Sequence, residues 1–206
     1  MNVLLLGDSH TVGPYGNALT TLFTNTGANV TRLANVGATG SNYLLGKYQK
    51  DYAAVAKQPF DIAIITLGTN DAAASDGVPP ARSAETFKKL ASGLNAKQVW
   101  YVGPPSFSDN AARTYNKVFA GPGKDLNTRS AAVFDAARAV FGGRAIDSRP
   151  PTAAFTQPNE IHLGKAGGSA WASAVFGRVQ AGDRGEGLWT VALIVSGVLL
   201  VRRFMR

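Results

Sequence analysis

The segment from Asp61 to Leu67, DIAIITL, constrains the fold more than any other part of the chain. It is rich in β-branched side chains and almost uniformly apolar, which is typical of a strand that is buried on both faces of a sheet. Short apolar runs elsewhere have the same character, so we expect four further strands. These are Val3–Gly7, Val30–Val36, Gln98–Gly103 and Arg144–Asp147.

Amphipathic segments separate several of these strands. Apolar residues recur there at the three- and four-residue spacing of a helix with one buried face. The expected helices are Pro80–Leu94, Thr128–Phe141 and Gly164–Val179. Strands that alternate with helices predict an α/β domain with a mainly parallel sheet, which we place over residues 1–180.

The composition excludes several classes of protein. Of the 206 residues, 45% are apolar and 17% are charged, which is typical of a globular chain and not of a disordered one. The chain has no Cys, which excludes disulfides, a thiol nucleophile and Cys-ligated metals, and its two His residues disfavour a His-rich metal site. We therefore expect no metal and no cofactor.

The net charge of +8 favours simple solubility or an anionic surface such as a polymer or lipid. The basic residues are spread along the chain without a basic-aromatic motif, so we do not expect a nucleic-acid partner. The sequence does not indicate an oligomeric state.

The C-terminal segment is distinct from the rest of the chain. Residues 188–205 begin with LWTVALIVSGVLLV, and a helix of this length would extend about 27 Å, close to the thickness of a bilayer core. We expect a single membrane-spanning helix there, joined to the domain by a polar linker at residues 181–187. The alternative is a buried core helix, because the uncharged run is short for a span.

The orientation of this segment stays open. The arginines at its end, Arg202, Arg203 and Arg206, favour a cytoplasmic C-terminus, which would place the domain outside the cytoplasm. The apolar run at residues 3–6 is too short to be a signal peptide that would lead it there. A cytoplasmic domain with a tail anchor is the rival, and a cell-envelope or virion membrane is a third setting.

Small and polar residues follow the first three expected strands. The runs are Gly7-Asp8-Ser9-His10, Asn35 to Gly40, and Gly68-Thr69-Asn70-Asp71. In a parallel α/β sheet, the carboxyl ends of the strands meet at one edge and carry the working residues. We therefore expect these three turns to form one site, to which the second histidine, His162, would be added by the fold.

These residue types suit nucleophilic catalysis. A serine hydroxyl needs a general base, usually His, and the developing oxyanion needs hydrogen-bond donors. Ser9 provides a hydroxyl at a strand-to-helix turn, and His162 is a candidate base. The backbone N–H groups of Ser9 and Gly40 and the side-chain amide of Asn70 are candidate oxyanion donors.

The order of these residues resembles that of the SGNH, or GDSL, hydrolase superfamily. The matching blocks are Gly7-Asp8-Ser9, Asn35-x-Gly37-x-x-Gly40, Gly68-Thr69-Asn70-Asp71 and a late Asn159-x-x-His162. The resemblance covers residues 1–180. It implies a flavodoxin-like, three-layer α/β/α sandwich and ester hydrolysis through an acyl-enzyme.

Carried over by position, the resemblance implies that Ser9 is the nucleophile and that His162 is the base. It also implies an oxyanion hole made by Ser9, Gly40 and Asn70, with Gly37 as the alternative to Gly40. We expect Asp8 and Asp71 to hold their turns by capping N–H groups. His10 follows Ser9 directly, and because adjacent side chains diverge we do not favour a role for it in substrate contact.

One position departs from the pattern of the superfamily. Its catalytic acid lies three residues before the His, where this chain has Asn159. Asn159 or a backbone carbonyl could orient His162 by a hydrogen bond, and Glu160 or Asp147 could replace the acid. The remaining alternative is an impaired site that only binds its ligand. If the missing acid limits turnover, Asn159→Asp should raise it.

The resemblance leaves the ester open. We expect a short acyl group, such as acetyl, on a carbohydrate or cell-envelope substrate, because no long apolar run in the domain suggests an acyl tunnel. The alternatives are a lysophospholipase or thioesterase for longer chains, and a membrane-anchored binding module. Phe107, in the loop from Gly103 to Asn110, is expected above the cleft, where it would contact a sugar or an acyl chain, or else to pack within its loop.

Overall fold

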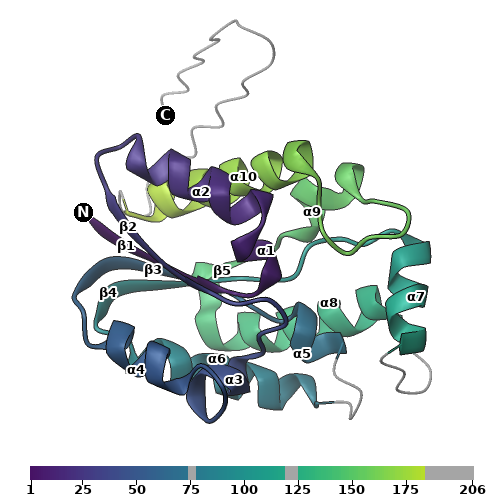
Figure 1. The fold of residues 1–206 in the computed structure, drawn as a ribbon, viewed down its shortest axis with the longest axis horizontal. Coiled ribbons are helices and arrows are strands. Elements are labelled where there is room, and N and C mark those ends of the chain that lie inside the picture. The colour runs from purple at the N-terminus through teal and green to yellow at the C-terminus, as the bar shows by residue number, and fades with distance from the viewer. Residues whose placement is uncertain (74–77, 119–124, 184–206) are drawn as a thin grey trace, which may run out of the picture.

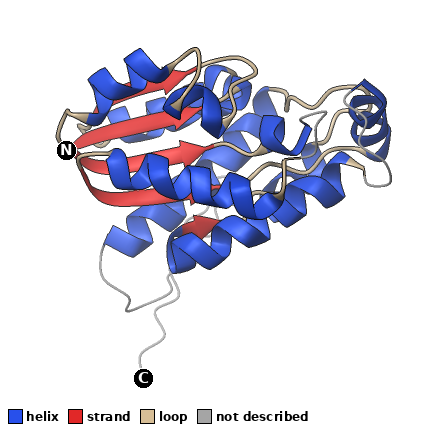
Figure 2. Ribbon diagram, turned by 90° about the horizontal axis from the view of Figure 1, so that it is seen from below, coloured by secondary structure: helices blue, strands red, loops and turns tan. Residues whose placement is uncertain are grey.

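The fold was analysed in a computed structural model, which describes residues 1–73, 78–118 and 125–183. Five parallel strands form one sheet in the order β2-β1-β3-β4-β5. Helices cover both faces of this sheet (Figures 1 and 2). The strands are β1 Asn2–Gly7, β2 Asn29–Ala34, β3 Phe60–Thr66, β4 Ala96–Val102 and β5 Ala145–Ile146. All five predicted strands are thus confirmed.

The helices form two layers, one on each face of the sheet (Figure 1). Near one face lie α1 Ser9–Val12, α2 Pro14–Thr24, α9 Arg149–Thr152 and α10 Lys165–Asp183. The other layer and its end contain α3 Gly40–Leu44, α4 Gln49–Ala56, α5 Thr69–Ala73, α6 Pro80–Gly93, α7 Asp109–Val118 and α8 Leu126–Phe141. Two short 3₁₀ helices, η1 Gly142–Arg144 and η2 Ala153–Phe155, complete the described elements.

The central strands are buried on both sides, as their sequence predicts. Along β1, Val3 and Leu5 pack with α2 and α10, whereas Leu4 and Leu6 pack into the cluster on the opposite face. Successive side chains of a strand point to opposite faces, so a strand that is apolar at every position requires a cover on both. This requirement explains the three layers.

The register brings the carboxyl ends of the strands to one level. Gly7 at the end of β1 pairs with Ala34 of β2 and with Thr66 of β3. Thr66 also pairs with Val102 of β4, which in turn pairs with Ile146 of β5. The strand order reverses next to β1, which is the place where ligands bind in open α/β sheets.

Several element boundaries shift by a few residues from the sequence-based expectation, and two of the shifts have a clear structural cause. β2 ends at Ala34 and not at Val36, because after the Asn35 N–H bonds to Gly7 O, the Asn35 carbonyl accepts from the Ala38 N–H in a turn that contains Gly37 at φ 74°. α10 continues through Asp183, so residues 181–183 of the expected linker are helical. A side chain at Gly182 would collide with the Trp100 ring, which shows how closely this last turn packs on β4.

Residues 184–206 lie outside the described residues, and with them the membrane-spanning segment expected at residues 188–205. Across the described ranges, none of the helices combines the length and the apolar character that a bilayer crossing requires.

Two glycines of α10 test how tightly this helix packs on α2. A Cβ atom at Gly168 would lie 2.7 Å from the Tyr15 backbone nitrogen, whereas a Cβ at Gly177 would meet nothing within 4 Å. We expect Gly168→Ala to lower the free energy of unfolding by about 1–3 kcal/mol through overpacking. We expect Gly177→Ala, the matched control, to raise it by about 0.5–1 kcal/mol. Urea denaturation measures both values, and equal effects would contradict the close contact.

Candidate active site

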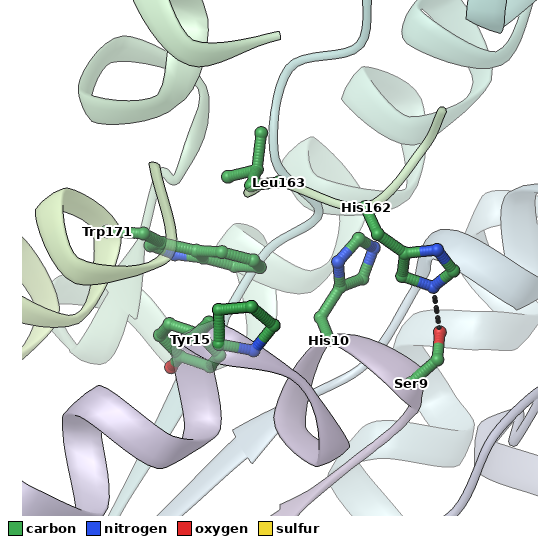
Figure 3. Close-up of a pocket in the computed structure, with 7 residues that line it drawn as sticks. Ser9, His10, Tyr15, His162, Leu163 and Trp171 are labelled. Carbon is green, nitrogen blue, oxygen red and sulfur yellow. Dashed lines mark hydrogen bonds between the residues drawn. The ribbon is translucent and has the colours of Figure 1, made fainter. Parts of the chain in front are cut away.

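Ser9 and His162 meet at the carboxyl edge of the sheet. Ser9 is the first residue of α1, directly after β1, and His162 lies in the loop before α10. The Ser9 Oγ and His162 Nε2 atoms are 2.8 Å apart (Figure 3). This distance places the imidazole within reach of the hydroxyl proton, as a serine nucleophile and its base require.

The turn that presents Ser9 is held by two hydrogen bonds. Asp8 is the N-cap of α1, and its Oδ1 accepts from the His10 N–H at 3.0 Å. The Tyr43 hydroxyl donates to Gly7 O at 2.6 Å. The predicted capping role of Asp8 is therefore confirmed, and the backbone on both sides of the nucleophile has a fixed partner.

The three candidate oxyanion donors reach the same edge. Ser9 lies in the first turn of α1, where backbone N–H groups have no partner within the helix. The Gly40 N–H donates to Asp71 Oδ1 at 3.2 Å. The Asn70 Nδ2 donates to Ala38 O at 3.0 Å and lies 3.4 Å from Asp8 Oδ2. Gly40 and Asn70 are thus held in place by acceptors of the protein itself.

Packing against α6 requires a glycine at position 40. A Cβ atom there would lie 2.8 Å from Thr86 Cγ2 and 2.9 Å from the Phe87 ring, both on α6. Gly40 therefore permits close packing of α3 against α6, not only a close approach of substrate. Gly37, the alternative to Gly40, is exposed on the loop after β2 with φ at 74°.

Another glycine sets the place of Asn70. Gly68 has φ at 121°, a conformation that L side chains rarely adopt, and it joins β3 to α5. This sharp turn puts Asn70 on the first turn of α5, beside the loop after β2.

Burial favours the neutral forms of two carboxyl groups beneath the site. The pKa of Asp8 is raised to about 7, chiefly by desolvation and also by the nearby charge of Asp71, against the lowering effect of the hydrogen bond from the His10 N–H. Desolvation also raises the pKa of Asp71 to about 6 against the hydrogen bond from Gly40 N–H. The second oxygen of Asp71, Oδ2, is buried without a partner among the described residues.

Asn159, which occupies the position of the superfamily's catalytic acid, is not hydrogen-bonded to His162 among the described residues. Asn159 is exposed, and its Oδ1 accepts from Asn110 Nδ2 at 2.6 Å. Glu160 is also exposed and forms an isolated antiparallel bridge with Gln157. Within the part of the chain that the structure describes, neither side chain makes a hydrogen bond to His162.

Asp147, the third candidate for the acid, is paired with another side chain. Its carboxylate accepts from Arg149 Nε at 2.8 Å and from Arg149 Nη2 at 2.7 Å. Partial burial alone would raise the pKa of Asp147, but the hydrogen bonds from Arg149 outweigh it and lower the pKa. The structure therefore pairs Asp147 with Arg149 at the end of β5 and does not bring it to His162 by a hydrogen bond.

His10 lies much closer to the base than its place in the sequence suggested. Its side chain is 4% exposed, and its ring centroid is 5.1 Å from that of His162 (Figure 3). Burial, and then the nearby His162, lower the pKa of His10 to about 3. Its Nε2 atom is buried without a hydrogen-bond partner among the described residues.

The sequence contains no pattern that predicts this contact, because residues 10 and 162 are brought together only by tertiary packing. The sequence did mark His10 as one of only two histidines and as the neighbour of Ser9.

Phe107 belongs to the packed interior of the site. It is 5% exposed, and its ring centroid is 6.4 Å from that of His10. Of the two expectations for this residue, packing within the fold is therefore confirmed. A small pocket of about 200 Å³ opens beside the two histidines. Its lining residues are Ser9, His10, Pro14, Tyr15, His162, Leu163 and Trp171.

Several solved structures share this fold. A carbohydrate acetylesterase from Sinorhizobium meliloti has a TM-score of 0.67 at 20% identity, over 87% of this chain and 98% of that chain. An aryl esterase from M. smegmatis has a TM-score of 0.68 at 18% identity over the same shares. A lipase/acylhydrolase from Enterococcus faecalis has a TM-score of 0.63 at 19% identity, over 89% of this chain and 96% of that chain.

No curated protein sequence matches the chain. Residues 5–169 match the model of the GDSL-like lipase/acylhydrolase family. This match contains the turns of Ser9, Gly40 and Asn70 and the loop of His162, and it spans most of the chain. The chain therefore belongs to the GDSL-like lipase/acylhydrolase family and is an esterase.

Proposed function

We propose that this esterase acts through an acyl-enzyme on Ser9, and that it removes a short acyl group from a carbohydrate at a cell envelope. The observation that carries the proposal is the 2.8 Å separation of Ser9 Oγ and His162 Nε2. A neutral serine becomes an effective nucleophile when a base at this distance accepts its proton.

In the first half of the reaction, His162 Nε2 takes the proton of Ser9 as Oγ attacks the ester carbonyl carbon. The carbonyl electron pair moves to its oxygen, which the Ser9 N–H and the Asn70 Nδ2 would stabilise. The Gly40 N–H would join them by exchanging its bond to Asp71 Oδ1 for one to the oxyanion. Collapse of this tetrahedral intermediate breaks the bond to the alcohol oxygen. The alcohol leaves with the proton from His162.

In the second half, a water molecule gives a proton to His162 and its oxygen attacks the acyl carbon. The new tetrahedral intermediate breaks its bond to Ser9 Oγ, which regains the proton from His162. The free carboxylic acid is released, and both side chains return to their starting protonation states.

Two observations support a short acyl group. The pocket beside Ser9 is small, because its empty space is only about 200 Å³ even when the part open to solvent is counted. The bulky side chains of Tyr15, Leu163 and Trp171 form part of its lining. A carbohydrate acetylesterase is among the proteins that share the fold, and this likeness fits acetyl as the group transferred.

The first test is the hydrolysis of p-nitrophenyl esters from acetyl to palmitoyl. We expect kcat/KM to be highest for acetyl, and Ser9→Ala to lower it by at least about a thousandfold, because the nucleophile is lost. A maximum at long acyl chains would replace the proposal with a lysophospholipase or thioesterase. Absence of Ser9-dependent turnover at every chain length would identify a binding module instead, and acetylated polysaccharide would then be tested for binding.

A second test concerns the position of the missing acid. The Asn159 amide oxygen already accepts from Asn110. A carboxylate at this position keeps that bond and has a second oxygen that can accept from the ring of His162 and stabilise its charged form. We expect Asn159→Asp to raise kcat on p-nitrophenyl acetate by about three- to tenfold. An unchanged or lower kcat, with the same thermal stability, would show that the acid position does not limit turnover.

We also propose that residues 188–205 anchor the enzyme to a membrane. The support is the uncharged run from Leu188 to Val201, followed by Arg202 and Arg203. Sedimentation of the full chain with phosphatidylcholine vesicles in high salt tests this proposal. We expect most of the protein to pellet with the vesicles, and Leu193→Arg combined with Val198→Arg to release it, because arginine at the centre of a span is costly. Equal pelleting of both proteins would contradict the anchor.

A further inference from the structure

A continuous row of aromatic rings supports the ring of His162 from the layer of α2 and α10. Tyr15 stacks on Trp171 with 4.0 Å between ring centroids and an interplanar angle of 24°. Trp171 meets His10 edge to face at 5.5 Å, and His10 meets His162 at 5.1 Å with a tilt of 52°. Figure 3 shows the His10 ring between Trp171 and the ring of His162.

The end of this row away from His162 consists of Trp171 and Tyr15, which are hydrogen-bonded to the end of a strand and to loops that follow strands. Trp171 Nε1 donates to Ser148 Oγ at 2.8 Å, and Ser148 Oγ donates to Gly103 O at 2.7 Å. The hydroxyl of Tyr15 lies 3.1 Å from Thr66 Oγ1 at the end of β3. Tyr15 and Trp171 are buried, so the row is a rigid support that ends against the base.

The near end of the row is suited to a base that becomes positively charged. Because His10 is buried and held neutral, its ring does not repel His162 when His162 takes the proton of Ser9. A neutral ring 5.1 Å away adds no positive charge that would oppose the proton on His162. The contact therefore favours one orientation of His162 in both of its charge states.

Among the described residues, the His162 ring makes no hydrogen bond to a carboxylate. In most triads a carboxylate fixes the orientation and tautomer of the base. Here Asn159 pairs with Asn110, and Asp147 pairs with Arg149. In the described residues, the one hydrogen bond of the His162 side chain is the contact with Ser9 Oγ.

We propose that His10 is a positioning residue whose ring orients His162 in place of the side chain at position 159. The proposal rests on the proposed roles of Ser9 and His162 in ester hydrolysis. It assigns the effect to the aromatic ring of His10, not to proton transfer by that ring. The Trp171 and Tyr15 rings act through His10 by holding it in place.

The test compares His10→Phe, which keeps a ring, with His10→Leu, which does not. We expect His10→Leu to lower kcat on p-nitrophenyl acetate by about tenfold while KM changes less than about twofold, because a misplaced base slows the chemical step. We expect His10→Phe to keep at least about a third of the wild-type kcat.

Phe23→Leu is the matched control for the loss of a buried ring. Phe23 is buried in the same layer, on α2, and its ring meets that of Phe176 at 5.0 Å. We expect this variant to lose thermal stability as His10→Leu does and to keep the wild-type kcat, because its ring does not support His162.

A second measurement does not depend on ester hydrolysis. The chain has two histidines, so both His10 variants leave His162 as the sole histidine, and its ring nitrogens give unambiguous ¹⁵N signals. We expect the signals of a single tautomer in His10→Phe and signals averaged over two tautomers in His10→Leu, because an unsupported ring reorients. This readout distinguishes failure of the positioning role from failure of the proposed reaction.

Three results would overturn the proposal. They are a wild-type kcat in His10→Leu, a loss in His10→Phe as large as that in His10→Leu, and identical ring signals in the two variants. The second result would assign the role to a nitrogen of His10. If His10→Phe does not fold, Trp171→Phe and Trp171→Leu form the same comparison one ring further along the row, and equal kcat values in that pair would also overturn it.

Discussion

The common level of the strand ends is the constraint on which the site depends. β1 lies between β2 and β3, and Gly7 pairs with the last residue of each, so the turns that carry Ser9, Gly40 and Asn70 begin side by side. This register is held by the burial of β1 and β3 on both faces, because a slip by one residue would exchange the side chains of the two cores. The stability of the sheet and the geometry of the site therefore have the same origin.

The buried side chains around Ser9 are polar, but their burial disfavours their charged forms. Burial shifts the pKa values of Asp8, Asp71 and His10 toward their neutral forms. The turn of Ser9 is held by a helix cap and by a tyrosine hydroxyl, and the base is in contact with a neutral ring. Such an arrangement stabilises the site through hydrogen bonds and packing, and it leaves the charge that develops on His162 to be balanced by the reacting groups.

Local patterns predicted much of this structure. The apolar run at residues 61–67 became β3, and the helical periodicity at residues 80–94 became α6, because burial on a sheet and on a helix face each leave a repeat in the sequence. Contacts between distant segments explain the differences. β2 ends early because Asn35 begins a turn closed by the Ala38 N–H, and α10 extends because its last turn packs on Trp100. Position 40 requires a glycine because α6 lies against it.

The sequence by itself determined the order of strands and helices and the four polar blocks, including the departure at Asn159. These are properties of neighbouring residues, which periodicity and spacing record. Only the tertiary structure decided what surrounds His162. It paired Asn159 with Asn110 and Asp147 with Arg149, and it placed the ring of His10 against the base. Those contacts follow from how α1, α10 and the loops pack on the sheet, and side chains far apart in the chain leave no local pattern of such packing.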